Sequence, residues 1–347
     1  MKNRLFRENI EAMKGYTPGE QPQRIGGWIK LNTNENPYPP SPAVDDVLRS
    51  SDPAALRLYP DPVCGEIRRT IADLYGFTEN NILVGNGSDD ILTIAVRSFV
   101  PENGMIASPD PSYSLYPVLA SIQGAECIKI PLNSDFTLPA NFAESAEGAS
   151  LIMIPRPNAP TGTAFELEKM RQICREFSGI VLIDEAYADF SDDNCIEFVK
   201  EFPNVIISRT LSKSYSLAGI RLGYVIASEE IINGMMKVKD SYNVNTLTQK
   251  IAVAALRDQE YLKANISKIC EVRKYLADAL TERNFKVIDS QTNFIFAAPP
   301  DEDGEKLYNS LKDQGILVRW FPGEETGKYI RITIGTKSEI DQLLKCL

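Results

Sequence analysis

Short apolar runs alternate with amphipathic stretches along the middle of the chain, and this alternation predicts an α/β fold. The expected strands cover residues 82–84, 105–107, 127–130, 151–154, 180–183, 205–207 and 223–227. Residues 89–99 and 166–177 have the spacing of helices. Because several runs are apolar at every position, both faces of their strands must be covered. We therefore expect a mainly parallel sheet packed between helices.

The pattern changes beyond about residue 240. Residues 248–283 form a long helical region, and residues 293–296, 315–318 and 329–333 are expected strands of a smaller α+β unit. The first forty residues are rich in Pro and Gly, which favours an arm or an edge strand. We therefore expect an N-terminal arm over residues 1–40, a large domain over 41–240 and a small C-terminal domain over 241–347.

The composition excludes several classes of protein. The 347 residues are 43% hydrophobic and 24% charged, which is typical of globular proteins. The net charge is −10, whereas a protein that binds nucleic acid or an anionic membrane usually carries an excess of basic residues. The chain has no histidine, which excludes Ser-His-Asp triads, Cys-His pairs and HExxH zinc sites. Its chemistry must therefore use Lys, Asp, Tyr, Arg or a cofactor.

The cysteines and the apolar runs predict a location. None of the six cysteines forms a CxxC pair, so we expect reduced thiols, no zinc site and no disulfide scaffold. Reduced thiols favour a reducing compartment. Met1–Glu20 shows no apolar region of a signal peptide, and no run is long enough to cross a membrane. We expect a cytoplasmic protein without a metal.

Four polar segments directly follow four of the apolar runs. They begin at Gly85, Pro155, Asp184 and Ser208. In open α/β sheets, ligands bind beyond the carboxyl ends of the strands. We therefore expect the four segments to meet at one pocket.

Each segment alone allows an ordinary interpretation. The turn at Gly85–Asp89 opens a helix, where free N–H groups bind phosphate, but it is also typical of a capped turn. Asp90 stands where a dinucleotide fingerprint needs its third glycine, so a dehydrogenase is the least favoured class. Alone, Asp184 and Lys213 are most simply an ion-paired strand end and a surface lysine.

Together, the segments supply what pyridoxal 5'-phosphate requires: phosphate donors, a lysine for a Schiff base and an aspartate for the ring nitrogen. The ordered set resembles the fold-type I pyridoxal-phosphate-dependent aminotransferases and, within them, the histidinol-phosphate branch. The resemblance covers nearly the whole chain and is carried by Leu31–Pro37, Arg57–Pro62, Pro109–Tyr116, Pro157–Gly162, Asp184–Tyr187, Ser212–Lys213, Leu217–Tyr224 and Arg331–Thr336.

The resemblance implies roles around the cofactor ring. Lys213 would bind the cofactor as a Schiff base and, once freed, move the proton between the substrate carbon and the cofactor. Asp184 would keep the ring nitrogen protonated, and Tyr187 would hydrogen-bond the ring 3'-oxygen. Tyr113 would stack on the ring, the alternative being ordinary aromatic core packing.

The resemblance also implies where the cofactor phosphate lies. Its ligands would be the backbone N–H groups of Gly87, Ser88 and Asp89, the hydroxyl of Ser212 and the guanidinium of Arg221. Tyr59 resembles a tyrosine that reaches the cofactor phosphate of the neighbouring subunit. We therefore expect a homodimer with shared active sites, in which the arm packs on the small domain and on the partner subunit.

One position departs from the family pattern. Many members have Pro-Asn-Asn-Pro-Thr-Gly, in which the second Asn contacts the ring 3'-oxygen, and this chain has Ala159 there. Either Asn158, which we expect in the cofactor site, moves in to replace it, or Tyr187 makes the contact alone. The sequence leaves both alternatives open.

The resemblance finally implies the substrates. Arg331 matches the arginine that binds the substrate anion, with Arg319 as a neighbour or a surface residue, while Tyr16 and Asn34 would close over the substrate. The implied reaction converts L-histidinol phosphate and 2-oxoglutarate into imidazole acetol phosphate and L-glutamate. The alternatives are an L-threonine-phosphate decarboxylase, an aromatic amino-acid aminotransferase and an inactive ligand sensor of the same fold.

Overall fold

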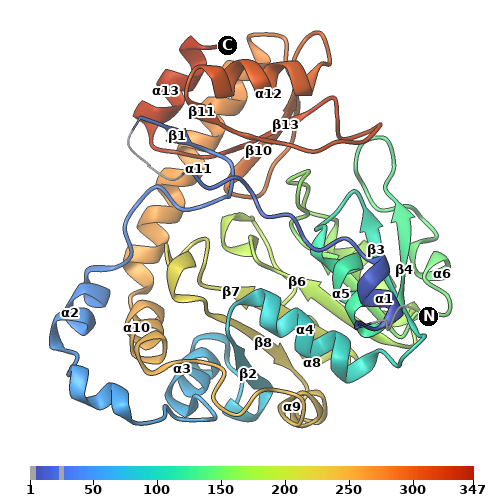
Figure 1. Ribbon diagram of the computed structural model, residues 1–347, viewed down its shortest axis with the longest axis vertical. Coiled ribbons are helices and arrows are strands. Elements are labelled where there is room, and N and C mark those ends of the chain that lie inside the picture. Colours follow the sequence, from blue (N-terminus) through green and yellow to red (C-terminus); the bar gives the residue numbers. More distant parts are fainter. Residues whose placement is uncertain (1–4, 23–26) are drawn as a thin grey trace.

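A seven-stranded sheet forms the centre of the larger lobe in the computed structural model, which describes residues 5–22 and 27–347 (Figure 1). The strand order is β2-β8-β7-β6-β5-β3-β4. The strands are β2 (Ile82–Gly85), β3 (Met105–Asp110), β4 (Glu126–Pro131), β5 (Leu151–Pro155), β6 (Ile180–Asp184), β7 (Val205–Thr210) and β8 (Gly223–Ala227). β7, β6, β5, β3 and β4 pair in parallel, whereas β8 is antiparallel to both of its neighbours. The expected mainly parallel sheet is confirmed.

Helices cover both faces of this sheet, as the fully apolar strands require. Alternate strand residues point to opposite faces, so Leu182 lies in one hydrophobic core and its neighbours Val181 and Ile183 lie in the other. One face carries α4 (Ser88–Phe99), α5 (Leu115–Gln123) and α9 (Glu229–Met236). The other carries α3 (Gly65–Tyr75), α7 (Leu167–Glu176), α8 (Phe198–Glu201) and α10 (Thr246–Arg257). The shorter helices are α1 (Glu8–Ala12), α2 (Pro42–Ser50) and α6 (Phe142–Ser145).

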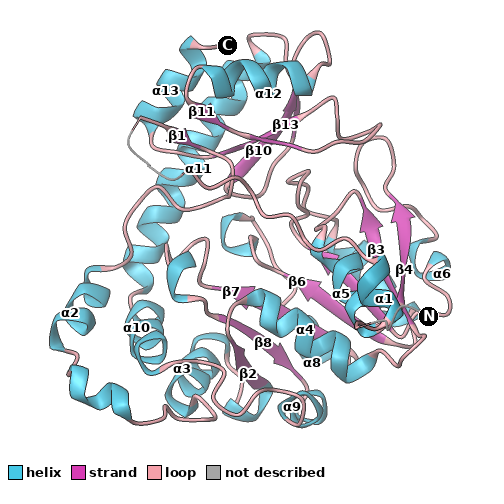
Figure 2. Ribbon diagram, in the orientation of Figure 1, coloured by secondary structure: helices cyan, strands magenta, loops and turns pink. Residues whose placement is uncertain are grey.

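The smaller lobe contains a four-stranded antiparallel sheet (Figure 2). Its order is β12 (Arg319–Trp320), β13 (Ile330–Thr333), β10 (Phe294–Ala298) and β9 (Lys286–Ile288). Its helices are α11 (Gln259–Thr281), α12 (Gly304–Asp313) and α13 (Lys337–Lys345). β1 (Ile29–Lys30) of the N-terminal arm pairs in parallel with β11 (Ile316–Leu317). The strand expected over residues 315–318 therefore pairs with the arm and not with the four-stranded sheet.

The helical region expected over residues 248–283 is interrupted at Asp258. This residue ends α10, and its carboxylate accepts the backbone N–H of Tyr261 at 3.2 Å as the N-cap of α11. Ser41 donates to the other carboxylate oxygen of Asp258. The apolar residues of α10 lie in a core of the large lobe, and Ile269 and Leu276 of α11 lie in the core of the small lobe. The change from one core to the other thus falls within α11, beyond the boundary expected near residue 240.

Candidate active site

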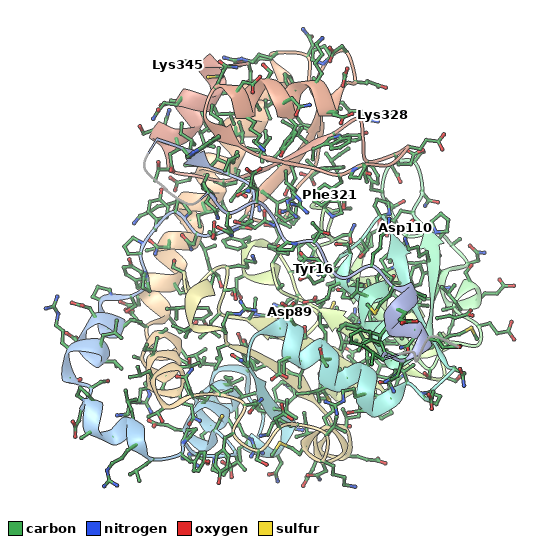
Figure 3. All side chains as sticks on the ribbon, in the orientation of Figure 1. Tyr16, Asp89, Asp110, Phe321, Lys328 and Lys345 are labelled. Carbon is green, nitrogen blue, oxygen red and sulfur yellow. The ribbon has the colours of Figure 1, made fainter. Side chains whose placement is uncertain are left out.

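A cleft of about 340 Å³ lies at the carboxyl ends of the parallel strands, between the two lobes. Each of the four polar segments contributes to its lining, through Ser88, Pro155, Asp184 and Ser212 among others. The prediction that these segments meet at one pocket is confirmed. Figure 3 labels Tyr16, Asp89 and Phe321 in the region where the lobes face each other, and all three line the cleft.

Asp184 ends β6 and lines this cleft, and only 4% of it is exposed. Its Oδ2 accepts a hydrogen bond from the Tyr116 hydroxyl at 3.0 Å, and its Oδ1 accepts from Ser208 Oγ at 3.1 Å and from the backbone N–H of Ala186 at 3.2 Å. Burial raises the pKa of Asp184 to about 6, although the three hydrogen bonds act in the opposite direction. The carboxyl group is held firmly, and its charged form needs a positive partner.

Lys213 and Tyr187 face the N-terminal arm across the cleft. Lys213 Nζ donates to the backbone carbonyl of Thr33 at 3.3 Å and lies 5.8 Å from the centre of the Tyr187 ring. The Tyr187 hydroxyl accepts a hydrogen bond from Asn34 Nδ2 at 2.8 Å. The arm thus positions two residues that come from the ends of different elements of the large lobe.

One end of the cleft is built to receive an anion. Ser88 begins α4, whose first N–H groups have no partner within the helix. Among the described residues, the Ser88 hydroxyl is one of the few buried polar groups without a hydrogen-bond partner. Gly87 has φ +88°, and a Cβ there would lie 2.6 Å from Arg221 Nη2. Glycine therefore lets the guanidinium approach the start of the helix, where it lies 3.5 Å from Asp89 Oδ2.

The other end of the cleft carries two arginines on neighbouring strands. Arg319 of β12 and Arg331 of β13 are directly paired in the register. Arg331 Nη2 donates to the Asn32 carbonyl at 3.0 Å, whereas its buried Nε has no partner among the described residues. Burial lowers the pKa of Arg331, and the charge of Arg319 acts in the same direction. Like charges placed opposite each other are unfavourable, so this pair favours a bound anion.

Aromatic side chains line the cleft between its two cationic ends. Tyr113 donates to Asp89 Oδ1 at 3.2 Å and packs edge-on against Tyr116. Tyr16 of the arm meets Tyr113 edge-on, with 6.0 Å between the ring centres. A flat ligand with two anionic ends would suit this arrangement.

Asn158 and Tyr59 do not line the cleft. Asn158 is buried beside it, where its Nδ2 donates to the Pro111 carbonyl at 3.1 Å and to Thr161 Oγ1 at 2.9 Å. Ala159 lines the cleft in its place. Tyr59 is 81% exposed and stacks on Tyr242, with 4.5 Å between the ring centres.

Comparison with known proteins identifies the family. Residues 26–347 match the profile described as aminotransferase class I and II. The chain belongs to this aminotransferase family. A histidinol-phosphate aminotransferase of Microcystis aeruginosa is 46% identical to this aminotransferase, and the match covers 98% of this chain and 97% of the relative. A second histidinol-phosphate aminotransferase, from a Synechocystis species, is also 46% identical, over 98% of this chain and 96% of the relative.

Solved structures confirm the expected fold-type I architecture of the aminotransferase. The histidinol-phosphate aminotransferase of Sinorhizobium meliloti, in complex with pyridoxal-5'-phosphate, superposes with a TM-score of 0.90. It covers 98% of this chain and 96% of its own, at 24% identity. An engineered aspartate aminotransferase of Thermus thermophilus shares the fold at 16% identity, with a TM-score of 0.82 and coverage of 99% and 98%.

Several residues of the aminotransferase site were missed in the sequence. Tyr116 and Ser208 hold Asp184, and Asn36 Nδ2 donates to the carbonyls of Lys213 and Ser214, both at 3.1 Å. Ser208 had a signal, since it is a polar residue that follows a fully apolar run. Tyr116 and Asn36 had no such signal, because the residues they contact are distant in the sequence. They were marked only as members of two segments that carry the family resemblance.

Proposed function

We propose that this aminotransferase uses pyridoxal 5'-phosphate to convert L-histidinol phosphate and 2-oxoglutarate into imidazole acetol phosphate and L-glutamate, in histidine biosynthesis. The names and the identity of the relatives support the reaction. The observation that carries the substrate class is the Arg319–Arg331 pair, because it places a second cationic group opposite the one at the start of α4.

The residues of the cleft fit the cofactor. Five groups suit its phosphate: the Ser88 hydroxyl, the Gly87 turn, the Arg221 guanidinium, the backbone N–H group of Asp89 and the hydroxyl of Ser212. The Ser88 hydroxyl has no hydrogen-bond partner among residues 5–22 and 27–347. Asp184 suits a protonated ring nitrogen, since a positive partner would lower its raised pKa and keep it charged. Tyr187 would contact the ring 3'-oxygen, and Tyr113 would cover one ring face.

When bound, the cofactor supplies an electron sink for the bonds of the substrate carbon next to nitrogen. Lys213 would hold it covalently and, once freed, would serve as the base that carries the proton from that carbon to the cofactor. Its hydrogen bond to the Thr33 carbonyl involves a neutral group, so no carboxylate needs to be displaced when the amine moves. Asp184 keeps its geometry throughout, because three hydrogen bonds fix the carboxyl group.

Arg319 and Arg331 would bind the anionic end of each substrate, which is a phosphate in one half-reaction and a carboxylate in the other. Arg331 Nε has no hydrogen-bond partner within the described part of the chain, and an arginine fork can bind an oxyanion with two parallel hydrogen bonds. Tyr16 and Asn34 lie on the arm side of the cleft, where the arm would cover the substrate. An aromatic amino acid offers only a carboxylate of single charge, so the more strongly charged phosphate matches the arginine pair better.

A homodimer with shared sites is the assembly that the surface favours. Tyr59 is highly exposed and does not line the cleft of its own chain. Leu56, Leu58 and Val63 beside it are exposed apolar residues as well. Exposed apolar clusters of this kind mark interaction surfaces, and a second copy of the chain would cover the cluster and receive Tyr59.

A cytoplasmic location is supported by the thiols, since all six cysteines are unpaired. Within residues 5–22 and 27–347, the structure has no helix that is both long and apolar enough to cross a bilayer.

The reaction can be tested with the purified holoenzyme by adding L-histidinol phosphate without an acceptor. We expect the cofactor absorbance to change from the pyridoxal form to the pyridoxamine form, and tyrosine to cause this change far less well. The Lys213→Ala variant should show neither the change nor turnover. Release of carbon dioxide from O-phosphothreonine would instead identify the decarboxylase, and a preference for tyrosine would identify the aromatic aminotransferase.

The role of the arginine pair can be tested with Arg331→Lys, which keeps the charge and removes the planar fork. We expect the KM for L-histidinol phosphate to rise by about tenfold or more, since a charged hydrogen bond to an oxyanion is strong. The rate at saturation should fall less than the KM rises. An unchanged KM for the phosphorylated substrate would contradict the assignment.

A further inference from the structure

Asn34 occupies an unusual place in the site. It is 2% exposed and has φ 57°, a left-handed conformation that Asn tolerates better than most residues. The residue belongs to the N-terminal arm, and it contacts both the large lobe and the small lobe. Its backbone carbonyl accepts a hydrogen bond from Asn293 Nδ2 at 3.0 Å, which anchors it to the small lobe.

The hydrogen bonds around Asn34 determine which atom of its side-chain amide faces Tyr187 and which group donates in each bond. Its backbone N–H donates to Thr333 Oγ1 at 3.0 Å, so the Thr333 hydroxyl retains its own hydrogen and donates it to Asn34 Oδ1 at 3.1 Å. This contact turns the amide nitrogen of Asn34 toward Tyr187 Oη, 2.8 Å away. An amide nitrogen only donates, so the Tyr187 oxygen accepts and keeps its proton for another acceptor.

We propose that Asn34 is a positioning residue: it orients the Tyr187 hydroxyl so that its proton points to the ring 3'-oxygen of the cofactor. This inference rests on the proposed function. It also explains how the chain works with Ala159 in place of the usual second Asn. The amide of Asn158 is engaged by Pro111 and Thr161 and cannot replace the missing donor, so Tyr187 remains to make the contact alone.

A single remaining donor must be well oriented to be effective, because hydrogen bonds weaken steeply as their angle departs from linearity. Thr333 and Asn293 of the small lobe hold Asn34, and Asn34 directs Tyr187 of the large lobe. The direction of the Tyr187 proton therefore depends on how the arm and the small lobe are seated against the large lobe.

The test uses the holoenzyme and the pH dependence of the absorbance of the cofactor bound to Lys213. A hydrogen bond donated to the ring 3'-oxygen withdraws charge from it and lowers the pKa of the adjacent nitrogen of Lys213. Asn34→Gly keeps the left-handed backbone and removes the amide. We expect it to raise the pH midpoint of the absorbance change by about half a unit to one unit and to weaken cofactor binding, as the loss of an oriented charged hydrogen bond predicts.

A double-mutant cycle separates this role from a general loosening of the arm. Tyr187→Phe should raise the midpoint at least as much as Asn34→Gly, and Asn34→Gly should add nothing in the Tyr187→Phe background. Ala159→Asn restores the second donor of the family pattern and should reverse most of the shift in Asn34→Gly. Asn265→Ala is the matched control, because Asn265 is a buried asparagine of α11 that does not line the cleft, and its midpoint should equal that of the wild type.

Two results would overturn the inference once circular dichroism shows that the variants are folded. One is a midpoint in Asn34→Gly that matches the wild type. The other is an equal shift from Asn34→Gly in the wild-type and Tyr187→Phe backgrounds, which would indicate an effect that does not pass through Tyr187. Failure of the wild-type protein to show the bound cofactor absorbance would overturn the proposed function instead.

Discussion

At the scale of single residues, Asp184 illustrates a conflict between folding and function. Its pKa is raised from 3.8 to about 6, because burial penalises the charged form more than Tyr116 and Ser208 stabilise it. In the cofactor-free enzyme, the folded state keeps a proton between about pH 4 and pH 6 that the unfolded chain has lost. The free energy of unfolding therefore falls as the pH rises through this window, by about 3 kcal/mol in total.

Asp184→Asn removes this titration. We expect the cofactor-free variant to become more stable than the cofactor-free wild type as the pH rises from 4.5 to 7, by about 2–3 kcal/mol. Urea unfolding of both proteins at the two pH values measures the difference. The holoenzymes are the control, since a positive ring nitrogen facing Asp184 should cancel or reverse the advantage. A stability difference that does not change with pH would show that burial does not raise this pKa.

Residue chemistry was the part of the site most accessible from the sequence. Asp184 and Lys213 lie in polar segments that follow apolar runs, and the rule that ligands bind at carboxyl strand ends places these segments at the pocket without a structure. The roles of both residues, and the choice of Arg221, came from the resemblance to the aminotransferases. Whether Asn158 or Tyr187 alone replaces the missing Asn at position 159 could not be decided. That answer depends on Pro111, Thr161 and Asn34, whose contacts with these residues exist only after the arm and the strands have folded together.

At the scale of elements, the start of α4 depends on its close approach to β8. A Cβ on Gly223 would lie 2.6 Å from the Ser88 backbone nitrogen and 2.7 Å from the Gly87 carbonyl carbon. These are backbone atoms, so the turn itself must move to accept a side chain. The N–H groups that we assign to the cofactor phosphate would move with it. Gly223 thus shapes the proposed phosphate site, although it would not contact the phosphate itself.

Gly223→Ala should therefore weaken binding of pyridoxal phosphate by about tenfold or more and reduce stability by about 1–3 kcal/mol, the usual cost of overpacking. Cofactor affinity can be measured by titrating the absorbance, and stability by thermal unfolding without cofactor. Gly219→Ala is the matched control, because a Cβ there has no atom within 4 Å. Equal effects of the two substitutions would show that the contact between β8 and the start of α4 is unimportant.

Elements were predicted best where the period of the pattern was unambiguous. The apolar strands of the large sheet lie where expected, with ends that shift by a few residues. The expected helical region over 248–283 is two helices, α10 and α11, whose compositions are similar. The break between them is the cap at Asp258, which is evident only from the hydrogen bonds that this residue makes with Ser41 and Tyr261. The pairing of β1 with β11 was also hidden, since two-residue strands have no period to detect.

At the scale of the whole molecule, the arm connects the parts that make the site. It pairs with β11 in the small lobe through β1, and it holds Lys213 through Thr33 and Tyr187 through Asn34. The cleft is therefore assembled from three stretches of chain that are far apart in the sequence. The proposed dimer adds a fourth stretch, around Tyr59, from another copy of the chain.

The exchange of Tyr59 between subunits can be tested by mixing two inactive or impaired variants. Tyr59→Ala keeps Lys213 and lacks the tyrosine, whereas Lys213→Ala keeps the tyrosine and cannot bind the cofactor covalently. If Tyr59 acts across the interface, a hybrid dimer contains one complete site, formed by Lys213 of the first chain and Tyr59 of the second. After the subunits are exchanged at equal amounts, roughly a quarter of all sites should be complete, because half of the dimers are hybrids.

Cofactor affinity is the appropriate measurement, since Tyr59 is assigned to the phosphate and not to the reaction itself. The mixture should contain a class of sites that retains pyridoxal phosphate as tightly as the wild type, and this class should be absent from either variant alone. Tyr242→Ala is a control for the surface, because Tyr242 stacks on Tyr59 in the same chain and should affect the affinity less. If the mixture binds no more tightly than Tyr59→Ala alone, Tyr59 serves its own chain or no cofactor at all, and the shared-site assembly must be abandoned.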